Sequence, residues 1–151
     1  SEAEHRAQAA LAAVSRLPAG VRVEKDVPDS IVVRVAREQM VVAFTNLVMN
    51  ALEWLPKGKG GRVTIRARQA GESVEVTIRD TGPGLTDREL EALRTFRPGR
   101  TTLKPDGNGF GLPQAHKTIR AHGGTLTLTS KVGKGTTVKV VLPVGADDED
   151  A

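Results

Sequence analysis

Three polar residues lie in register within an otherwise apolar run of the sequence. Asn46, Asn50 and Glu53 are spaced at i, i+4 and i+7, so a helix would place them in one stripe beside its apolar face. Asparagine is a poor helix former, costing several tenths of a kcal/mol relative to alanine. The two asparagines therefore indicate either plain solvent exposure or a metal site, because an amide oxygen is a hard ligand that Mg²⁺ binds together with water and phosphate oxygens.

A second polar motif begins at Asp80, where a segment of alternating apolar residues ends and Thr81-Gly82-Pro83-Gly84 follows. One interpretation is an ordinary Asp-x-Gly turn. The other is a binding site, in which the carboxylate accepts a hydrogen bond from an exocyclic amine while Gly82 and Gly84 let a flat base lie against the backbone. Adenine has both the shape and the amine that such a site needs.

A glycine-rich segment precedes a predicted helix and consists of Gly107, Asn108, Gly109, Phe110, Gly111 and Leu112. Its backbone N–H groups and the positive end of the helix could converge on a phosphate. The segment is not the dinucleotide-binding fingerprint, because its third glycine comes one place early and no strand precedes it; no GxxxxGK[ST] sequence occurs either. Taken alone, the segment is also consistent with a flexible loop.

Taken together and in this order, the motifs resemble the N, G1, F and G2 boxes of the GHKL ATP-binding superfamily. The N box would be residues 46–51, the G1 box residues 80–84 and the G2 box residues 107–112. The F box would comprise Phe96, Pro98, Thr101 and Thr102. The chain looks most like the catalytic ATP-binding domain of a bacterial two-component sensor histidine kinase, over about residues 21–144.

This resemblance implies ATP (or ADP) and Mg²⁺ as the bound cofactors. Asn50 would coordinate the Mg²⁺ that bridges the phosphates and Asn46 would line the phosphate channel, so these two are the expected catalytic residues. Asp80 would bind the adenine amino group, with Gly82 and Gly84 shaping its pocket.

The resemblance also implies a lid over the nucleotide. Residues 107–112 would hold the phosphates and anchor this lid, in which Thr101 and Thr102 lie. Trp54, the only tryptophan, falls near the place where relatives often carry an aromatic residue against the base. Packing of Trp54 in the core is an equal alternative.

The residue at position 46 separates the branches of the superfamily. Gyrase-type, mismatch-repair and chaperone ATPases and the related serine kinases usually carry a glutamate one turn before the metal-binding asparagine, where it acts as a general base. Asn46 cannot accept a proton, and transfer to an already nucleophilic imidazole needs positioning and charge neutralisation instead. We therefore expect a histidine kinase, with an anti-sigma-type serine/threonine kinase or a non-catalytic nucleotide-sensing module as alternatives.

The chain itself offers no matching phosphate acceptor. His5 is followed by Arg6, whereas the family's acceptor histidine is followed by an acidic residue, and helix packing or capping explains His116 and His122. The expected partners are therefore an upstream dimerisation and histidine-phosphotransfer domain and a cognate response regulator.

The elements that position these motifs follow from the spacing of apolar residues. Spacing of three and four residues predicts helices at residues 1–17, 37–55 and 110–121, with a shorter one at 87–95. Alternation predicts strands at 21–27 and 31–35 and two hairpins, one near residues 63–78 and one near residues 126–142. The rest of the stretch from 81 to 108 is predicted to be a functional loop or lid.

The predicted fold class is α/β (α+β), because helices and antiparallel hairpins favour a two-layer sandwich. The resemblance implies the Bergerat ATP-binding type, with a mixed, mostly antiparallel sheet packed on three main helices and an ATP lid. Residues 1–17 are expected to be a helix or linker from the upstream domain, residues 18–144 the catalytic ATP-binding domain, and residues 145–151 a disordered acidic tail.

Composition excludes several other classes of protein. The 151 residues are 38% hydrophobic and contain no cysteine, which is typical of a globular domain without disulfides or thiolate metal sites. The net charge is +4, but the basic residues are scattered and aromatic residues make up 3%, so no nucleic-acid partner is expected. No apolar run reaches the ~18 residues of a membrane helix. The expected location is cytoplasmic, with a parent protein that can be membrane-anchored.

Overall fold

The computed structural model describes residues 21–28, 31, 35–56, 58–95 and 111–144 of the chain. Its elements, in chain order, are β1 (Val21–Asp26), α2 (Arg37–Glu53), β2 (Gly61–Ala70), β3 (Ser73–Asp80), α3 (Asp87–Leu93), α4 (Gly111–Ala121), β4 (Thr125–Lys131) and β5 (Gly135–Pro143). This order confirms the predicted sequence of helices and hairpins within the described residues. The predicted helix at 1–17, the predicted tail at 145–151 and the F-box residues lie outside them.

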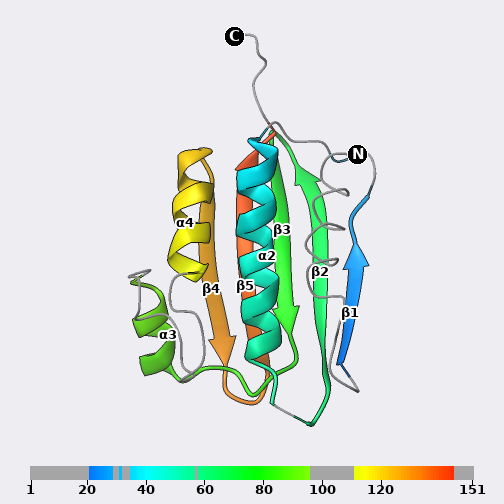
Figure 1. The fold of residues 1–151 in the computed structure, drawn as a ribbon, viewed down its shortest axis with the longest axis vertical. Coiled ribbons are helices and arrows are strands. Elements are labelled where there is room, and N and C mark those ends of the chain that lie inside the picture. Colours follow the sequence, from blue (N-terminus) through cyan, green and yellow to red (C-terminus); the bar gives the residue numbers. More distant parts are fainter. Residues whose placement is uncertain (1–20, 29–30, 32–34, 57, 96–110, 145–151) are drawn as a thin grey trace, which may run out of the picture.

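Five strands form one sheet in the order β1-β2-β3-β5-β4 (Figure 1). Strand β1 runs parallel to β2, and the other three pairings are antiparallel. The sheet is therefore mixed and mostly antiparallel, as predicted. Helices α2 and α4 lie side by side over one face of it, and the shorter α3 lies beside β4 (Figure 1).

Alternation along the strands separates the two faces of the sheet. Ile65 of β2 pairs with Ile78 of β3, which pairs in turn with Val138 of β5, and all three are buried under the helices. The next row, Thr64, Arg79 and Thr137, lies on the opposite face. Because side chains alternate with a period of two, each strand has one apolar face and one polar face.

Helix α2 forms the centre of the core. Its buried residues are Met40, Ala43, Phe44, Leu47, Val48 and Ala51. They follow the three- and four-residue spacing that predicted this helix, and they pack against Leu112, Ala115 and Ile119 of α4 and the apolar face of the sheet. The polar residues Asn46 and Asn50 of the same helix are only partly buried, so they lie at the border of the core.

Three local predictions need correction. Helix α2 ends at Glu53, two residues before the predicted end at Leu55, because Trp54 already caps it. A strand was predicted at residues 31–35, but neither Ile31 nor Val35 lies in a strand. Ile31 is buried, and residues 32–34 lie outside the described residues. Helix α3 is shorter than the predicted 87–95; it starts with a capping box in which Thr86 and Glu89 satisfy each other's backbone N–H groups at 3.1 and 2.9 Å.

Among the described residues, no helix combines the length and the apolar character that crossing a lipid bilayer requires.

Candidate functional site

Asp80 is the last residue of β3, and its side chain points into the protein, where it is 1% exposed. One carboxylate oxygen, Oδ1, accepts hydrogen bonds from the backbone N–H of Gly82 at 2.8 Å and of Thr136 at 3.3 Å. The other oxygen, Oδ2, is buried and has no hydrogen-bond partner within the described structure. Asp80 is therefore fixed through one oxygen and presents the other.

Burial raises the pKa of the Asp80 carboxyl above its ordinary value, and the hydrogen bonds from Gly82 and Thr136 lower it in part. Buried polar atoms in proteins are nearly always paired, so an unpaired carboxylate oxygen is unusual. A ligand that donates a hydrogen bond to Oδ2 would remove the cost of leaving this atom unpaired. This supports the interpretation of Asp80 as a binding residue over that of an ordinary turn.

Gly82 brings the loop after β3 against the end of α2. A Cβ atom at position 82 would lie 2.7 Å from the carbonyl oxygen of Trp54 and 3.0 Å from Asp80 Oδ1. Since only a glycine fits there, the backbone of residues 80–82 packs directly on the C-terminal end of α2. The Trp54 side chain is partly buried and packs against the hydrophobic core, in line with the core-packing alternative.

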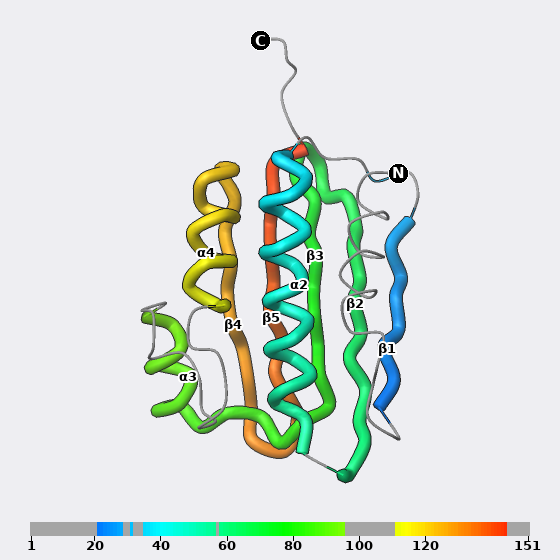
Figure 2. The backbone as a smooth tube through the Cα atoms, in the orientation of Figure 1, coloured from blue at the N-terminus to red at the C-terminus, as the bar shows by residue number. Residues whose placement is uncertain are grey.

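Gly84 takes a backbone conformation that favours glycine, with φ of +78°, and a Cβ there would collide with the carbonyl group of Lys131. The next turn is tied to the same loop, because the N–H of Gly133 donates to the carbonyl oxygen of Pro83 at 2.7 Å. Figure 2 shows this β4–β5 turn beside the loop that follows β3. Both glycines of the predicted G1 box are thus required by close backbone contacts.

Thr136 and Ser130 complete the surroundings of Asp80, and the sequence assigned neither a role. The two hydroxyl groups lie 2.8 Å apart, and Ser130 Oγ also donates to the carbonyl of Gly135 at 3.0 Å and accepts from the N–H of Leu85 at 2.7 Å. The cluster anchors β4 and β5 to the loop that carries the glycines. Its members are up to 56 residues from Asp80 in sequence, so no local pattern signals it.

The two asparagines of α2, Asn46 and Asn50, lie one helical turn apart. The Asn50 side-chain nitrogen, Nδ2, is buried without a partner in the described part of the chain. A Cβ on Gly111, the first residue of α4, would lie 3.4 Å from both Cγ and Oδ1 of Asn46. The start of α4 therefore lies against Asn46.

Helix α2 spans the whole site. Trp54 marks the end next to Asp80 and Gly82, and Asn46 marks the end next to the N-terminus of α4. They are eight positions apart in the sequence, which corresponds to about 12 Å along the axis at 1.5 Å per residue. Asn50 lies midway. The site is thus an elongated track with a buried carboxylate at one end and a helix N-terminus at the other.

Helix α4 begins at Gly111, and Leu112 and Pro113 follow in its first turn, all three buried. The N–H groups of a first helical turn have no partner inside the helix, and the helix dipole makes this end electropositive. The proline at position 113 lacks only an N–H that would be free there anyway. Of the predicted phosphate-binding residues, Gly107, Asn108, Gly109 and Phe110 lie outside the described residues, as do Thr101 and Thr102 of the predicted lid.

The described histidines have structural surroundings. His122 accepts a hydrogen bond at Nε2 from the backbone N–H of Ala36 at 3.0 Å, and its Nδ1 lies 2.8 Å from the Thr118 carbonyl oxygen. Because a backbone N–H can only donate, a neutral ring carries its proton on Nδ1. Burial in α4, with the nearby Arg120 charge, lowers the pKa of His116. The hydrogen bonds of His122 join the C-terminal end of α4 to the residue before α2, which is a structural role.

Comparison with known proteins identifies the family. Residues 35–146 match the model of the "Histidine kinase-, DNA gyrase B-, and HSP90-like ATPase" family. Because this match covers most of the chain and contains the whole track from α2 to β5, the chain belongs to this family.

The curated relatives narrow the comparison to sensor kinases. The chain is 33% identical over 113 residues to the sensor histidine kinase ZraS of Escherichia coli (strain K12), covering 75% of this chain and 23% of ZraS. It is 35% identical over 119 residues to the histidine protein kinase DivJ of Caulobacter vibrioides, covering 78% of this chain and 20% of DivJ. These relatives confirm the resemblance to sensor histidine kinases, of which the chain spans about a fifth to a quarter of the length.

Solved structures show the same fold. The mycobacterial sensor histidine kinase MprB superposes with a TM-score of 0.77 at 26% identity, over 95% of both chains. Full-length ShkA in complex with AMPPNP superposes with a TM-score of 0.74 at 21% identity, over 97% of this chain and 30% of ShkA. The predicted fold class, a mixed sheet packed on helices as in histidine kinase catalytic domains, is confirmed.

Proposed function

We propose that this domain binds Mg²⁺-ATP along the track on α2 and transfers the γ-phosphate to a histidine on a separate dimerisation domain. A response regulator would then receive the phosphate. The observation that carries the proposal is the location of the unpaired buried atoms. Within the described residues there are two, Asp80 Oδ2 and Asn50 Nδ2, and both belong to the predicted site. Leaving a buried polar group unpaired costs about 1–3 kcal/mol, so a ligand that pairs at these two positions gains affinity.

Asp80 would select the base. Its free Oδ2 can accept a hydrogen bond from the adenine amino group, while Oδ1 stays fixed by the N–H of Gly82. Guanine and hypoxanthine carry a carbonyl oxygen at the corresponding ring position, which would face the carboxylate oxygen without a proton between them. Adenine nucleotides are therefore the expected ligands, with Gly82 and Gly84 holding the pocket open.

The middle of the track would hold the metal and the phosphates. Turning the Asn50 amide by about 180° exchanges its oxygen and nitrogen, which would present Oδ1 to Mg²⁺ at the unpaired position. The described residues contain no group of three or more His, Cys, Asp or Glu side chains suited to a metal ion. We infer that Mg²⁺ takes its other ligands from phosphate and water. The start of α4, beside Asn46, would bind phosphate oxygens together with residues 107–112, and Thr101 and Thr102 would belong to the lid.

Asn46 favours a histidine as the acceptor. In the transfer, an imidazole nitrogen forms a bond to the γ-phosphorus while the bond from that phosphorus to the leaving ADP oxygen breaks. A neutral imidazole needs no base to become nucleophilic, whereas a hydroxyl or a water molecule does. Asn46 cannot act as that base, so its role would be to position the phosphates. This argues against the serine/threonine kinase alternative.

The parent protein would supply the histidine that accepts the phosphate. The relatives are several times longer than the matched region, which supports a separate dimerisation and phosphotransfer domain joined through residues 1–17. Residues 18–144 would be the catalytic ATP-binding domain, followed by the tail at 145–151. We place the domain in the cytoplasm, where ATP is available, on a parent that can be membrane-anchored.

Calorimetric titration of the chain with ATP, with and without Mg²⁺, tests the proposal. Asn50→Ala should remove the Mg²⁺-dependent part of ATP affinity, whereas Gln114→Ala, on the exposed side of α4, should leave it unchanged. Fluorescence of Trp54 provides a second readout, because its carbonyl contacts Gly82. Equal Mg²⁺-ATP affinity in the Asn50→Ala variant would overturn the metal assignment. Tight binding without any phosphotransfer by the full-length parent would select the nucleotide-sensing alternative.

A further inference from the structure

The face of the sheet away from α2 and α4 carries rows of cationic and hydroxyl side chains. Cross-strand pairing places Thr64, Arg79 and Thr137 in one row, and Arg66 and Thr77 in the next. All belong to the strand positions that alternate with the buried ones, so they lie on the same side. No helix of the described structure covers this side (Figure 1).

This face carries a hollow of about 690 Å³. Four cationic side chains line it, namely Arg62, Arg66, Arg79 and Lys134. Glu24 of β1 is the single carboxylate among the described lining residues, so these residues carry an excess of three positive charges. Threonine side chains occupy the positions between the cations and can donate further hydrogen bonds to an anion.

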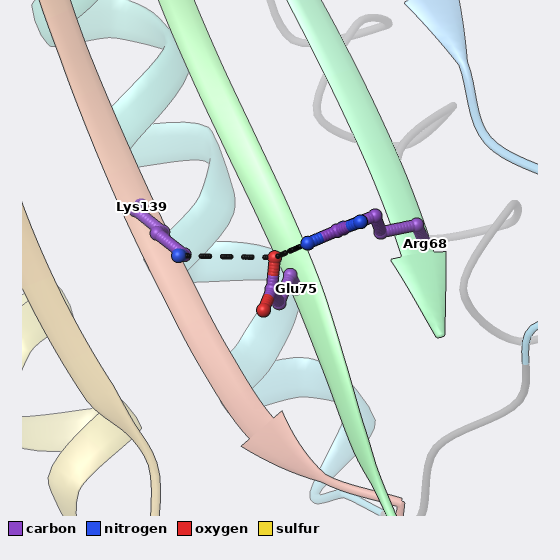
Figure 3. A network of polar contacts seen from close by, with 3 residues as sticks. All are labelled: Arg68, Glu75 and Lys139. Atoms are coloured by element: carbon purple, nitrogen blue, oxygen red, sulfur yellow. Dashed lines mark hydrogen bonds and ion pairs between the residues drawn. The ribbon is translucent and has the colours of Figure 1, made fainter. Parts of the chain in front are cut away.

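Carboxylates of the chain already bind the cations at the border of this hollow. Arg62 pairs with Glu24 at 3.8 Å, and Arg66 pairs with Asp26 at 3.6 Å. Next to them, Glu75 bridges Arg68 at 3.0 Å and Lys139 at 3.8 Å across three strands (Figure 3). Cations on this face therefore form ion pairs with carboxylates at several places along the strands.

Arg79 and Lys134 differ from these neighbours. Within the described residues, neither has an ion pair. Arg79 lies on the central strand β3, one residue before its end, and Lys134 lies in the turn between β4 and β5. Guanidinium groups bind carboxylates in a bidentate fork. These two cations are available for an anion from outside the chain.

We propose that this hollow docks an acidic segment of a partner polypeptide, with its carboxylates on Arg79 and Lys134. Val132, in the turn next to Lys134, is 69% exposed and gives the border an apolar contact that a polypeptide can use and a free phosphate cannot. The described residues that line the hollow include no aromatic side chain on which a nucleotide base would stack. The hollow lies on the face of the sheet away from α2, and the proposed nucleotide track lies on the helix side. The two adjoin at Thr81, which lines the hollow and lies between Asp80 and Gly82 in the sequence.

An NMR titration of the ¹⁵N-labelled chain tests this proposal. The probe is a synthetic peptide in which glutamate alternates with serine, and the control peptide has glutamine in place of glutamate. We expect saturable shifts of the amides of Thr64, Arg79 and Thr137 with the glutamate peptide and none with the glutamine peptide. The double variant Arg79→Gln/Lys134→Gln should bind about 2- to 30-fold more weakly, from two exposed pairs of about 0.2–1 kcal/mol each.

A matched double variant controls for the loss of charge. Arg88→Gln/Lys117→Gln removes two exposed cations from α3 and α4 and should bind the peptide as the unmodified chain does. Equal weakening by both double variants would overturn the proposal, because binding would then follow net charge alone. Absence of shifts on β2, β3 and β5, or the same shifts with inorganic pyrophosphate at equal concentration, would overturn it as well. Nucleotide titrations of the Asn50 variant leave this result unaffected, so the two proposals fail independently.

Discussion

The carbonyl oxygen of Trp54 lies 2.7 Å from the point where a Cβ atom on Gly82 would be. This contact joins the last turn of α2 to the loop that follows β3, and it fixes the distance between Asp80 and the asparagines of α2. Both partners are backbone, which cannot move aside as the end of a flexible side chain can. The spacing of the site therefore depends on the absence of one methyl group.

Substitution of this glycine should disrupt the site. Gly82→Ala is expected to lower the free energy of unfolding by about 1–3 kcal/mol through overpacking, and to weaken ATP binding because α2 and the loop must separate. Urea denaturation and calorimetry measure the two effects. Gly58→Ala is the control for ATP affinity. Its φ of +77° makes an alanine costly for stability, but no atom lies within 4 Å of the added Cβ, so ATP binding should not change. Unchanged ATP affinity in Gly82→Ala would show that the contact does not set the geometry of the site.

Replacement of Asp80 by asparagine should change base selectivity. Asp80→Asn keeps an oxygen for the Gly82 N–H but presents an amide donor in place of the free Oδ2. We expect weaker binding of ATP and relatively stronger binding of inosine triphosphate, whose base carries a carbonyl oxygen in place of the amine. Competition titrations with the two nucleotides give the ratio. A parallel loss of both affinities would indicate that Asp80 acts only in folding.

The raised pKa of Asp80 predicts a pH dependence of stability. Burial raises the pKa above the ordinary value of 3.8, so the native state keeps a proton that the unfolded chain has already lost. The free energy of unfolding should then decrease as pH rises from about 3.8 through the raised pKa, and this contribution should level off above it.

The Asp80→Asn variant should lack this decrease, which denaturation of both proteins at a series of pH values would show. Glu91→Gln, exposed on α3, controls for the loss of a carboxylate elsewhere. A constant difference in stability between Asp80→Asn and the unmodified chain across this range would contradict the assignment of the shift to burial of Asp80.

His122 should anchor the start of α2. Its Nε2 accepts the hydrogen bond from the Ala36 N–H, while Nδ1 faces the Thr118 carbonyl oxygen. His122→Ala should cost about 1 kcal/mol of stability and speed hydrogen exchange of the amide of Ala36. Lys117→Ala, exposed on α4, is the control. Exchange at Ala36 that stays as slow as in the unmodified chain would show that the imidazole does not hold this end.

The local elements could be predicted because their signals are local. The apolar residues of α2 repeat at helical spacing, and the β2–β3 hairpin alternates on both sides of Gly71, so each pattern fits within a few turns of chain. The parallel pairing of β1 with β2 could not be located in the same way, since 34 residues separate Asp26 from Gly61 and no turn signal joins them. Mixed topology was expected only because of the family resemblance.

The same distinction holds for the site. Some site residues could be identified because their side chains have a specific chemistry and lie at a defined place in a helix or after a strand. These are Asn46, Asn50, Asp80 and Gly82. Thr136 was missed, since its contribution to Asp80 is a backbone N–H, which every residue except proline has. The cationic hollow was missed as well, because its charges come from separate strands and look scattered in the sequence.

The hydrogen bond between Gly133 and Pro83 connects the two faces of the sheet. Pro83 belongs to the loop around the proposed adenine pocket, and Gly133 precedes Lys134 in the turn that borders the proposed docking hollow. A displacement of this turn would thus displace the loop as well, and a displacement of the loop would displace the turn. If the acidic partner changes the affinity for ATP by some factor, ATP must change the affinity for that partner by the same factor. A signalling protein could use such reciprocity to report its nucleotide state to whatever is docked on the opposite side.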